Sequence, residues 1–487
     1  MLFNSMEFLL FFPITVIIYF MLPSKAKNVE LLIMSYIFYM GWNAKYSLLL
    51  LTVTSTTYLT ALLLERDKWR LMRKKLLIIC ISINLALLCF FKYGNFILEN
   101  LNKLTGGEFS TLNVLLPVGI SFYIFQAMGY VVDVYRGELR AEKNFVTYAL
   151  FVSFFPQLVA GPIERSSNLL KQMKENHCFD YCRVREGLLL MLWGLFQKLV
   201  IADRVAILVD RVFNNYTSYY GACRAVAAIF FAIQIYCDFG GYTNIAIGAA
   251  KVMGFSLVNN FDSPYFAVSI KDFWRRWHIS LSQWFRDYVY ISLGGSRCSR
   301  IKKYRNLMFT FLLSGLWHGA GWNFVVWGGM HGAYQIIGEA LEPLKKKIYV
   351  VLNIDETTDL HRLWRQIITF VLVDIAWIIF RMSSLKDGLA FISGMVSDFN
   401  LYMLIRDPVP IFAAMGFSIN ELAVLLAGLL LLWGVDLCRK KVYIPEWLAE
   451  QNAPARWIIY ISLLFLILIY GIYGTDYAQT QFIYFQF

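Results

Sequence analysis

Two histidines lie in strongly apolar and aromatic stretches of the chain. His278 stands in KDFWRRWHISLSQWFRDYVY, and His318 stands in FLLSGLWHGAGWNFVVWGGMHG. Imidazole titrates near neutral pH and is costly to hold in hydrocarbon, so a histidine in such surroundings is a candidate for function. Burial keeps the ring neutral and able to take the proton of an attacking hydroxyl. A second imidazole or an amide could then hold a carbonyl or steady a leaving thiolate. The pair indicates acyl transfer, with both histidines catalytic.

The stretch around His318 has two interpretations. Its glycines would let helices approach closely, so a lone histidine there is explained equally well by packing. His318 is accompanied by His278 and His331, and polar side chains lie near all three, which favours a functional site. Trp317 and Asn323 are predicted to contact the substrate, whereas the role of His331 stays open.

The segment 271–290 alternates cations with aromatic rings. An amphipathic helix at the membrane interface explains this pattern, because aromatic rings favour the headgroup level. Its guanidinium groups could also hold the phosphates of an acyl donor such as coenzyme A. The two interpretations are compatible. The predicted substrate-binding residues of the segment are Arg275, Arg276, Trp277, Ser282 and Arg286.

An acidic residue, Asp238, stands beside two glycines in the apolar sequence YCDFGGYTNIAIG. Its carboxylate could bind substrate, or it could pair with a nearby arginine and hold the fold. Glu164 and Arg165 have a similar setting in FFPQLVAGPIER. Asp238 is included among the predicted substrate-binding residues, with both interpretations open.

The composition indicates what positions these residues. Of 487 residues, 58% are hydrophobic and only 16% are charged, which is typical of an integral membrane protein. We predict an all-α, polytopic fold of about 11–13 transmembrane or re-entrant helices, because apolar runs of spanning length recur along the chain. The runs cover roughly 7–22, 29–51, 46–64, 76–92, 112–132, 186–208, 224–253, 306–340, 366–381, 410–436 and 457–473.

The net charge of +12 lies mainly in short loops beside the apolar runs. This distribution follows the positive-inside rule and argues against binding of nucleic acid. With Lys25 and Lys27 in the cytosol, the N-terminus lies outside. With 439–441 in the cytosol, the final residues also lie outside. The first helix lacks a basic flank and a cleavage site, so we expect it to be retained.

The eight cysteines are scattered and indicate no disulfide framework. His177, Cys178 and Cys182 cluster in HCFDYC, but three ligands without a fourth are too few to predict a metal site. No linker or low-complexity tract divides the chain, so we predict one membrane domain over 1–487. Prolines, glycines and charges concentrate in 114–340, where broken helices would surround a cavity and form the catalytic core region.

The chain resembles the membrane-bound O-acyltransferases, and within them the bacterial alginate O-acetyltransferase-like branch. The motifs that carry the resemblance run along the whole chain: PVGISFYIFQ, FFPQLVAGPIER, YCDFGGYTNIAIG, DFWRRWHISLSQWFRDYVYISLGG, LSGLWHGAGWNFVVWG and FIYFQF. The resemblance implies that His318 and His278 match the family's two key polar positions. It also implies a central tunnel through the bacterial inner membrane, by which a cytosolic donor reaches a buried histidine. Asn244 and Lys171 depart from the pattern of this branch, where aspartate and proline are expected.

The aromatic C-terminal motif, 482–487, would ordinarily be an interfacial anchor. The resemblance suggests another role, since similar tails with a central tyrosine receive the acyl group. Tyr484 is therefore predicted to be catalytic, taking the acyl group at His318 and passing it to a partner outside the membrane.

The function predicted from these features is transfer of an acyl group, most simply acetyl, across the membrane for O-acetylation of an exported or cell-wall polysaccharide. Acetyl-CoA or another thioester would be the cytosolic donor substrate, with no bound cofactor. Membrane lipid would surround the protein. The resemblance implies an extracytoplasmic SGNH-hydrolase-like partner, because this chain has no G-x-S-x-G motif for the final transfer.

Two alternatives remain. D-alanyl transfer to teichoic acid is close in chemistry, but members of that branch are shorter and take their aromatic tail from a separate protein. A polysaccharide or lipid transporter would also explain charges within apolar runs, but it predicts two related halves with paired broken helices, which the sequence does not display. A glycosyltransferase is disfavoured because no D-x-D motif is found.

Overall fold

The computed structural model describes residues 1–439, 442–473 and 482–483. All regular elements within these ranges are helices, which confirms the predicted all-α fold. The chain divides into two compact units. Unit 1 comprises Met1–Trp193 and Tyr242–Asn259, and unit 2 comprises Gly194–Gly241 and Asn260–Phe487. The single membrane domain and the central tunnel stay predictions.

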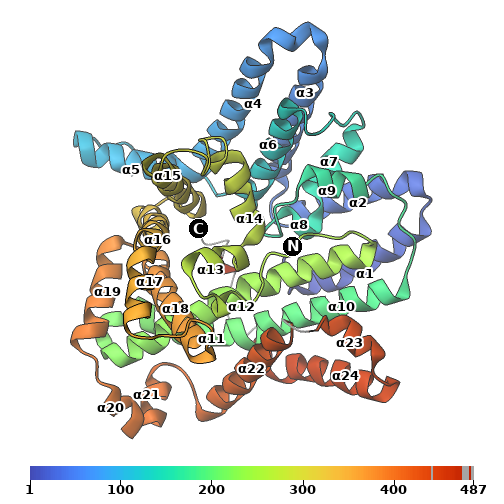
Figure 1. Cartoon of the computed structure of the whole chain (residues 1–487). Helices are drawn as coiled ribbons and strands as arrows, with labels where there is room; N and C mark the ends of the chain where they lie inside the picture. The colour runs from blue at the N-terminus through green and yellow to red at the C-terminus, as the bar shows by residue number, and fades with distance from the viewer. Residues whose placement is uncertain (440–441, 474–481, 484–487) are drawn as a thin grey trace. The chain divides into compact units, whose positions relative to one another are not determined.

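Unit 1 is built from short and medium helices (Figure 1), with α3 packed against α4, α6 and α7, and α2 against α7. Apolar helices tolerate hydroxyl side chains when these bond to their own backbone. In α3 the hydroxyl groups of Thr54 and Thr57 donate to carbonyl groups one turn earlier. The helices are α1 Met6–Met21, α2 Ser24–Met40, α3 Ser47–Glu65, α4 Arg73–Leu88, α5 Gly94–Thr105, α6 Ile120–Arg136, α7 Phe145–Ser153, α8 Phe155–Leu158 and α9 Ser166–Gln172.

Two helices continue from one unit into the other: α10, Tyr181–Leu195, and α12, Gly221–Met253. Directly after α10 the backbone forms a π-helical turn, η4, over Phe196–Ala202. π-Helical turns are rare in proteins, and those that occur are often found at functional sites. The helix α11, Asp203–Asn214, follows immediately.

The remaining helices belong to unit 2 and include the broken segment that carries His278. They are α13 Ile270–Arg276, α14 Ile279–Trp284, α15 Arg300–His318, α16 Trp322–Ala340, α17 Glu342–Val351, α18 Asp359–Arg381, α19 Leu385–Ser397, α20 Leu401–Arg406, α21 Pro408–Ala414, α22 Ile419–Cys438, α23 Ile444–Glu450 and α24 Ala453–Tyr470.

Helices α15 and α16 form a tight hairpin (Figure 1). A Cβ atom added to Gly315 would lie 2.2 Å from the carbonyl oxygen of Phe324, and one added to Gly328 would lie 2.2 Å from that of Phe311. Only glycine fits at this crossing, which confirms the predicted close helix interface. The crossing holds the end of α15, where His318 lies.

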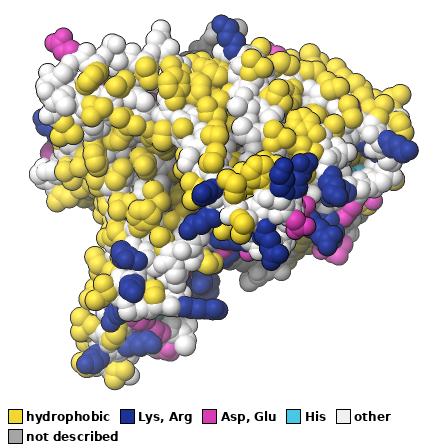
Figure 2. All heavy atoms as spheres, turned by 90° about the horizontal axis from the view of Figure 1, so that it is seen from above, with side chains coloured by type: hydrophobic (Ala, Val, Ile, Leu, Met, Phe, Trp, Pro, Cys, Tyr) yellow, Lys and Arg dark blue, Asp and Glu magenta, His cyan; other side chains and the backbone are white. Residues whose placement is uncertain are grey.

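Six helical segments in the described ranges are long and apolar enough to cross a membrane. Large hydrophobic side chains are exposed on α24, among them Trp457 and Phe465, as expected for a surface that faces lipid. Figure 2 shows broad hydrophobic areas on the viewed face, with Lys and Arg gathered in patches. The exact number of passages stays a prediction. The six segments are Ala44–Glu65, Asp67–Thr105, Gly221–Met253, Asp359–Arg381, Ile419–Cys438 and Ala453–Tyr470.

Candidate active site

His278 lies at the break between α13 and α14. Its backbone is left-handed, with φ 42° and ψ 55°, a conformation that costs a non-glycine residue on the order of 1–2 kcal/mol. The segment 271–290 is therefore not one continuous amphipathic helix. Strain of this kind persists where surrounding contacts impose it, as they do at many active sites. The imidazole is fully buried.

Asn260 holds this break in place. Its side-chain oxygen accepts hydrogen bonds from His278 Nδ1 at 3.1 Å, from the Ser280 backbone N–H at 3.2 Å and from the Ser280 hydroxyl at 2.9 Å. Its carbonyl oxygen accepts the N–H of Ile279. Since an amide oxygen only accepts, the bond assigns a proton to Nδ1, and Nε2 is the basic nitrogen of the neutral ring. The sequence interpretation missed Asn260, although an asparagine pair in FSLVNNF was a visible signal.

His318 is the last residue of α15 and is 3% exposed. Aromatic side chains surround its ring: Trp317, Trp327 and Phe380 have centroids 5.0, 4.9 and 5.6 Å away. The centroids of His278 and His318 are 6.4 Å apart. Residues 40 positions apart in sequence thus share one cluster of aromatic side chains, which we call the histidine pocket, and both imidazoles are close enough to face one small acyl group.

His331, on α16, has a packing role in the described contacts. Its Nδ1 accepts a hydrogen bond from Trp274 Nε1 at 3.2 Å, and its ring lies parallel to that of Phe273. It is fully buried and also contacts Trp327, which in turn packs on His318. His331 therefore supports the wall of the pocket.

Three predicted substrate-binding residues lie in the histidine pocket or in the aromatic side chains packed around it. Trp317 contacts both His278 and His318. Trp277 is fully buried and packs on Phe261 and Trp377, so it is part of the aromatic frame. Ser282 is half-buried, and its hydroxyl donates to the carbonyl of Trp277 at 3.4 Å.

Asn323 lies near the start of α16. Its amide nitrogen donates to the carbonyl of Met382 at 3.0 Å, which ties α16 to the end of α18. This contact fixes the hairpin turn that follows His318.

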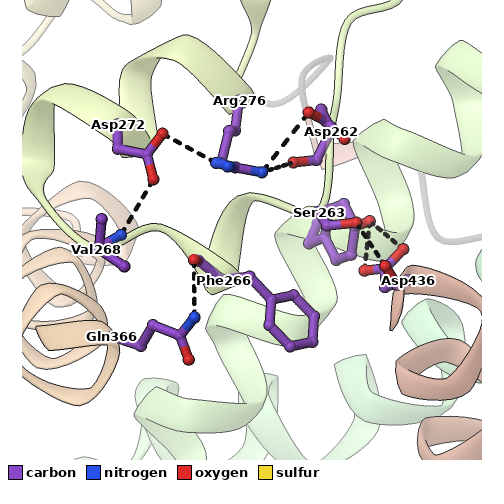
Figure 3. Close-up of polar contacts among 9 residues, drawn as sticks. Asp262, Ser263, Phe266, Val268, Asp272, Arg276, Gln366 and Asp436 are labelled. Carbon is purple, nitrogen blue, oxygen red and sulfur yellow. Dashed lines mark hydrogen bonds and ion pairs between the residues drawn. The ribbon is translucent and has the colours of Figure 1, made fainter. Parts of the chain in front are cut away.

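The arginines of 271–290 differ in their surroundings. Figure 3 shows Arg276 between Asp272, at 3.1 Å, and Asp262, at 3.6 Å, so its guanidinium closes the loop that precedes His278. Arg286 pairs with Asp287 at 2.6 Å. Arg275 is exposed. Arg286 is exposed as well, so an anionic group from solvent can reach both Arg275 and Arg286, and Arg286 is already paired with a carboxylate.

Asp238 pairs with a lysine rather than with an arginine. It is 3% exposed, and its Oδ1 lies 2.5 Å from Lys198 Nζ, which also lies 2.9 Å from Asp203 Oδ1. Its Oδ2 accepts the backbone N–H of Ile483 at 2.7 Å. The next residue on α12, Phe239, contacts the ring of His278 at 4.8 Å. Tyr484 lies outside the described residues.

Glu164, in unit 1, is a separate buried acid. It accepts hydrogen bonds from the Val258 N–H at 2.5 Å and from the Asn168 amide at 2.8 Å. Burial raises its pKa to about 7, and these hydrogen bonds oppose the shift. It holds two loops of unit 1 together.

A surface pocket of about 470 Å³ lies in unit 2 between the start of α18 and the end of α22. Arg362 and Cys438 are among its lining residues, and neither His278 nor His318 is. Gln366, which also lines it, donates to the carbonyl of Phe266 (Figure 3). The pocket is thus distinct from the histidine site.

An all-helical chain with spanning helices and a buried histidine pair has the features of an intramembrane acyltransferase. The model of the membrane-bound O-acyltransferase family, MBOAT, matches residues 35–349. The chain belongs to this family: it is a multi-pass membrane protein and an O-acyltransferase, as the sequence predicted.

Curated relatives agree with this assignment. The chain is 39% identical to a probable alginate O-acetylase AlgI from Azotobacter vinelandii over 79% of this chain and 76% of the relative. It is 36% identical to a peptidoglycan O-acetyltransferase from Helicobacter pylori over 81% and 80% of the two chains. A teichoic acid D-alanyltransferase from Bacillus subtilis is 28% identical, over 48% of this chain and 62% of the relative.

Proposed function

We propose that this protein moves an acetyl group from a cytosolic thioester, acetyl-CoA, through the bacterial inner membrane for O-acetylation of an exported or cell-wall polysaccharide. The observation that carries the proposal is the pair of buried imidazoles of His278 and His318, 6.4 Å apart in an aromatic pocket. Relatives named for O-acetylation of alginate and of peptidoglycan support the acceptor class.

In the proposed chemistry, an attacking hydroxyl oxygen forms a bond to the thioester carbonyl carbon and the carbon–sulfur bond breaks. His318 takes the hydroxyl proton as general base and returns it to the leaving thiolate, which departs as the thiol. His278 steadies the tetrahedral oxyanion or the thiolate in its protonated form, in which Nδ1 donates to Asn260 and Nε2 donates to the reacting group. The aromatic walls exclude water and so protect the thioester from hydrolysis.

The hydroxyl that attacks first is proposed to belong to Tyr484. The resulting tyrosyl ester would carry the acetyl group to the outer side, where an SGNH-hydrolase-like partner would transfer it to the polymer. The expected outside location of the C-terminal end supports this order. On the cytosolic side, exposed Arg275 is proposed to meet the donor phosphates.

D-alanyl transfer is the second candidate. It is favoured by the match to the Bacillus subtilis teichoic acid D-alanyltransferase, although that match covers only 48% of this chain. The matches to O-acetylating relatives cover about four fifths of this chain, and the chain carries its own aromatic tail. These two facts favour acetyl transfer.

The decisive experiment incubates the purified, reconstituted protein with acetyl-CoA radiolabelled in the acetyl group. We expect covalent label on the wild type, none on His318→Ala, and none on Tyr484→Phe. His361→Ala is the matched control, because His361 is a buried histidine that packs on Tyr349, away from the pocket. Label retained by His318→Ala would contradict the proposal, as would labelling by a D-alanyl thioester in place of acetyl-CoA.

A further inference from the structure

Three charged side chains lie buried together in unit 2. Lys198, on the π-helical turn η4, is 1% exposed and lies between Asp203, the first residue of α11, and Asp238 of α12. We call these three residues the Lys198 triad. Removing ions from water is costly even when they are paired, by several kcal/mol per ion. A buried cluster of this kind needs a reason, and the proposed acyl-transfer chemistry does not use it.

The triad also binds the end of the chain. Asp238 Oδ2 accepts the backbone N–H of Ile483 at 2.7 Å, and Lys198 Nζ lies 4.3 Å from the centroid of the Phe482 ring. Phe482 and Ile483 are 1% and 3% exposed. Charge-assisted hydrogen bonds and cation–π contacts are strongest when water is excluded, as it is here.

The same region binds the chain where it leaves α24. The N–H of Ile472 donates to the carbonyl of Leu199 at 2.9 Å, and Arg204 donates to the carbonyl of Tyr470 at 2.6 Å. Helix α24 also packs on η4. The turn η4 and the start of α11 thus hold the C-terminal part of the chain at two places, residues 470–472 and residues 482–483.

We propose that the Lys198 triad is an internal docking site whose ligand is the aromatic C-terminal segment of this same chain. The carboxylate of Asp238 recognises a backbone N–H, and the ammonium of Lys198 selects an aromatic ring at the preceding position. Phe239 follows Asp238 on α12 and contacts His278, so docking places residues 482–483 one residue of α12 away from a neighbour of His278. Docking itself is independent of the proposed function, but its purpose, positioning of an acyl acceptor, rests on it.

The test measures docking directly, through the reactivity of a thiol introduced at position 483. Ile483→Cys keeps the backbone N–H that binds Asp238, and residues 457–487 contain no cysteine. We call the introduced sulfhydryl group the reporter thiol. Its alkylation by N-ethylmaleimide is followed by mass spectrometry of the C-terminal peptide from the full chain in detergent micelles. The reporter thiol should react slowly, and Asp238→Asn or Phe482→Ala should accelerate the reaction at least roughly ten-fold, as expected when a charge-assisted hydrogen bond is lost.

A matched control and an internal monitor keep the result interpretable. Asp436→Asn also removes a buried carboxylate, one that bonds to the Tyr236 hydroxyl, and it should leave the rate at the reporter thiol unchanged. Native Cys223, which is 3% exposed in α12, reports unfolding if it too becomes reactive. If Cys223 becomes reactive in Asp238→Asn, the docking site is judged from Phe482→Ala alone, because this substitution changes only the tail. The docking site would be overturned if the reporter thiol reacts at the same rate with and without Phe482→Ala and Asp238→Asn.

Acetyl transfer, measured on the same variants, separates the two proposals. If the reporter thiol is protected and is released by Asp238→Asn, yet transfer is unchanged, the docking site stands and its purpose, positioning of an acyl acceptor, is wrong. If the reporter thiol is unprotected while Tyr484→Phe abolishes labelling, the relay stands and the docking site is wrong.

Discussion

The histidine pocket and the Lys198 triad are two buried polar clusters of unit 2 with opposite constructions. Around His278 and His318 the neighbours are mainly aromatic rings, with one amide, Asn260, fixing a tautomer. In the triad, one lysine is held by two carboxylates at 2.9 and 2.5 Å. The imidazoles of the histidine pocket can therefore exchange a proton. In the Lys198 triad, by contrast, the charged groups form ion pairs with each other.

This difference is what the proposed roles require. A general base must change its protonation state during the reaction, so strong ion pairs would oppose its work. A docking site must hold one charge state and one geometry, and paired charges in a dry interior provide both. Substitutions in the histidine pocket should therefore change acetyl transfer alone, and substitutions in the Lys198 triad should change docking of the tail.

The largest effect is expected at His318. His318→Ala should lower the rate of acetyl transfer on the order of 10²–10⁴-fold, because it removes the proposed base. Protection of the reporter thiol should be unchanged. The measurement is labelled transfer beside the alkylation rate, with His361→Ala as control. Loss of protection in His318→Ala would show that the two clusters are not separate.

A smaller loss is expected from Asn260→Ala. Misplacement of a catalytic group by about 1 Å can cost on the order of 10²-fold. This variant frees His278 Nδ1 and both the backbone N–H and the hydroxyl of Ser280, while the Ile279 N–H keeps its bond to the backbone carbonyl of residue 260. Turnover should fall while KM for acetyl-CoA stays close to the wild-type value. Asn215→Ala removes an exposed side-chain bond to Arg211 and serves as the control. An Asn260→Ala enzyme with normal turnover would remove Asn260 from the positioning role.

Asp238→Asn, unlike His318→Ala, should change docking of the tail as well as acetyl transfer. It should shift docking of the tail about ten-fold towards release, the effect of roughly 1.4 kcal/mol in one charge-assisted bond. Transfer should fall by a similar factor, because the acceptor is no longer held beside the pocket. Alkylation of the reporter thiol and labelled transfer, read from the same preparation, measure both. If transfer is lost while the reporter thiol stays fully protected, Asp238 takes part in the acyl-transfer reaction and not in docking.

The helix hairpin provides a test of the pocket alone. Gly328→Ala should destabilise the α15–α16 crossing by about 1–3 kcal/mol, because the added methyl would meet the Phe311 carbonyl. Gly329→Ala is the matched control, since a Cβ there lies 3.4 Å from the Leu312 side chain. Gly328→Ala should lower both the thermal unfolding temperature and the rate of acetyl transfer, whereas Gly329→Ala should change neither. Equal effects of the two substitutions would contradict the close crossing.

The smallest effect is expected at Arg275. Arg275→Gln should raise KM for acetyl-CoA by up to roughly five-fold, the value of an exposed charge contact of about 1 kcal/mol. The effect should diminish at high salt, because exposed charges are screened. Turnover and protection of the reporter thiol should not change. An unchanged KM at low salt would exclude Arg275 from donor binding.

Sequence alone predicted the membrane class, the helical fold and the two histidines. Apolar runs such as 457–473 predict helices because, away from water, a chain must satisfy its backbone hydrogen bonds internally. Helix α24, Ala453–Tyr470, confirms that run. His278 and His318 were recognisable because a titratable group is expensive in apolar surroundings, and this cost can be judged from neighbouring residues alone.

The partners of these residues were decided by tertiary structure. Asp238 is 40 positions from Lys198 and 245 from Ile483, and Asn260 reaches His278 only because the backbone breaks between α13 and α14. Local patterns show that a buried charge or imidazole needs a partner. They do not show which one, because that choice depends on contacts between segments far apart in the chain. The sequence by itself therefore determined that buried polar groups exist and where they lie along the chain. Packing alone decided that two imidazoles lie among aromatic rings and that one lysine lies between two carboxylates.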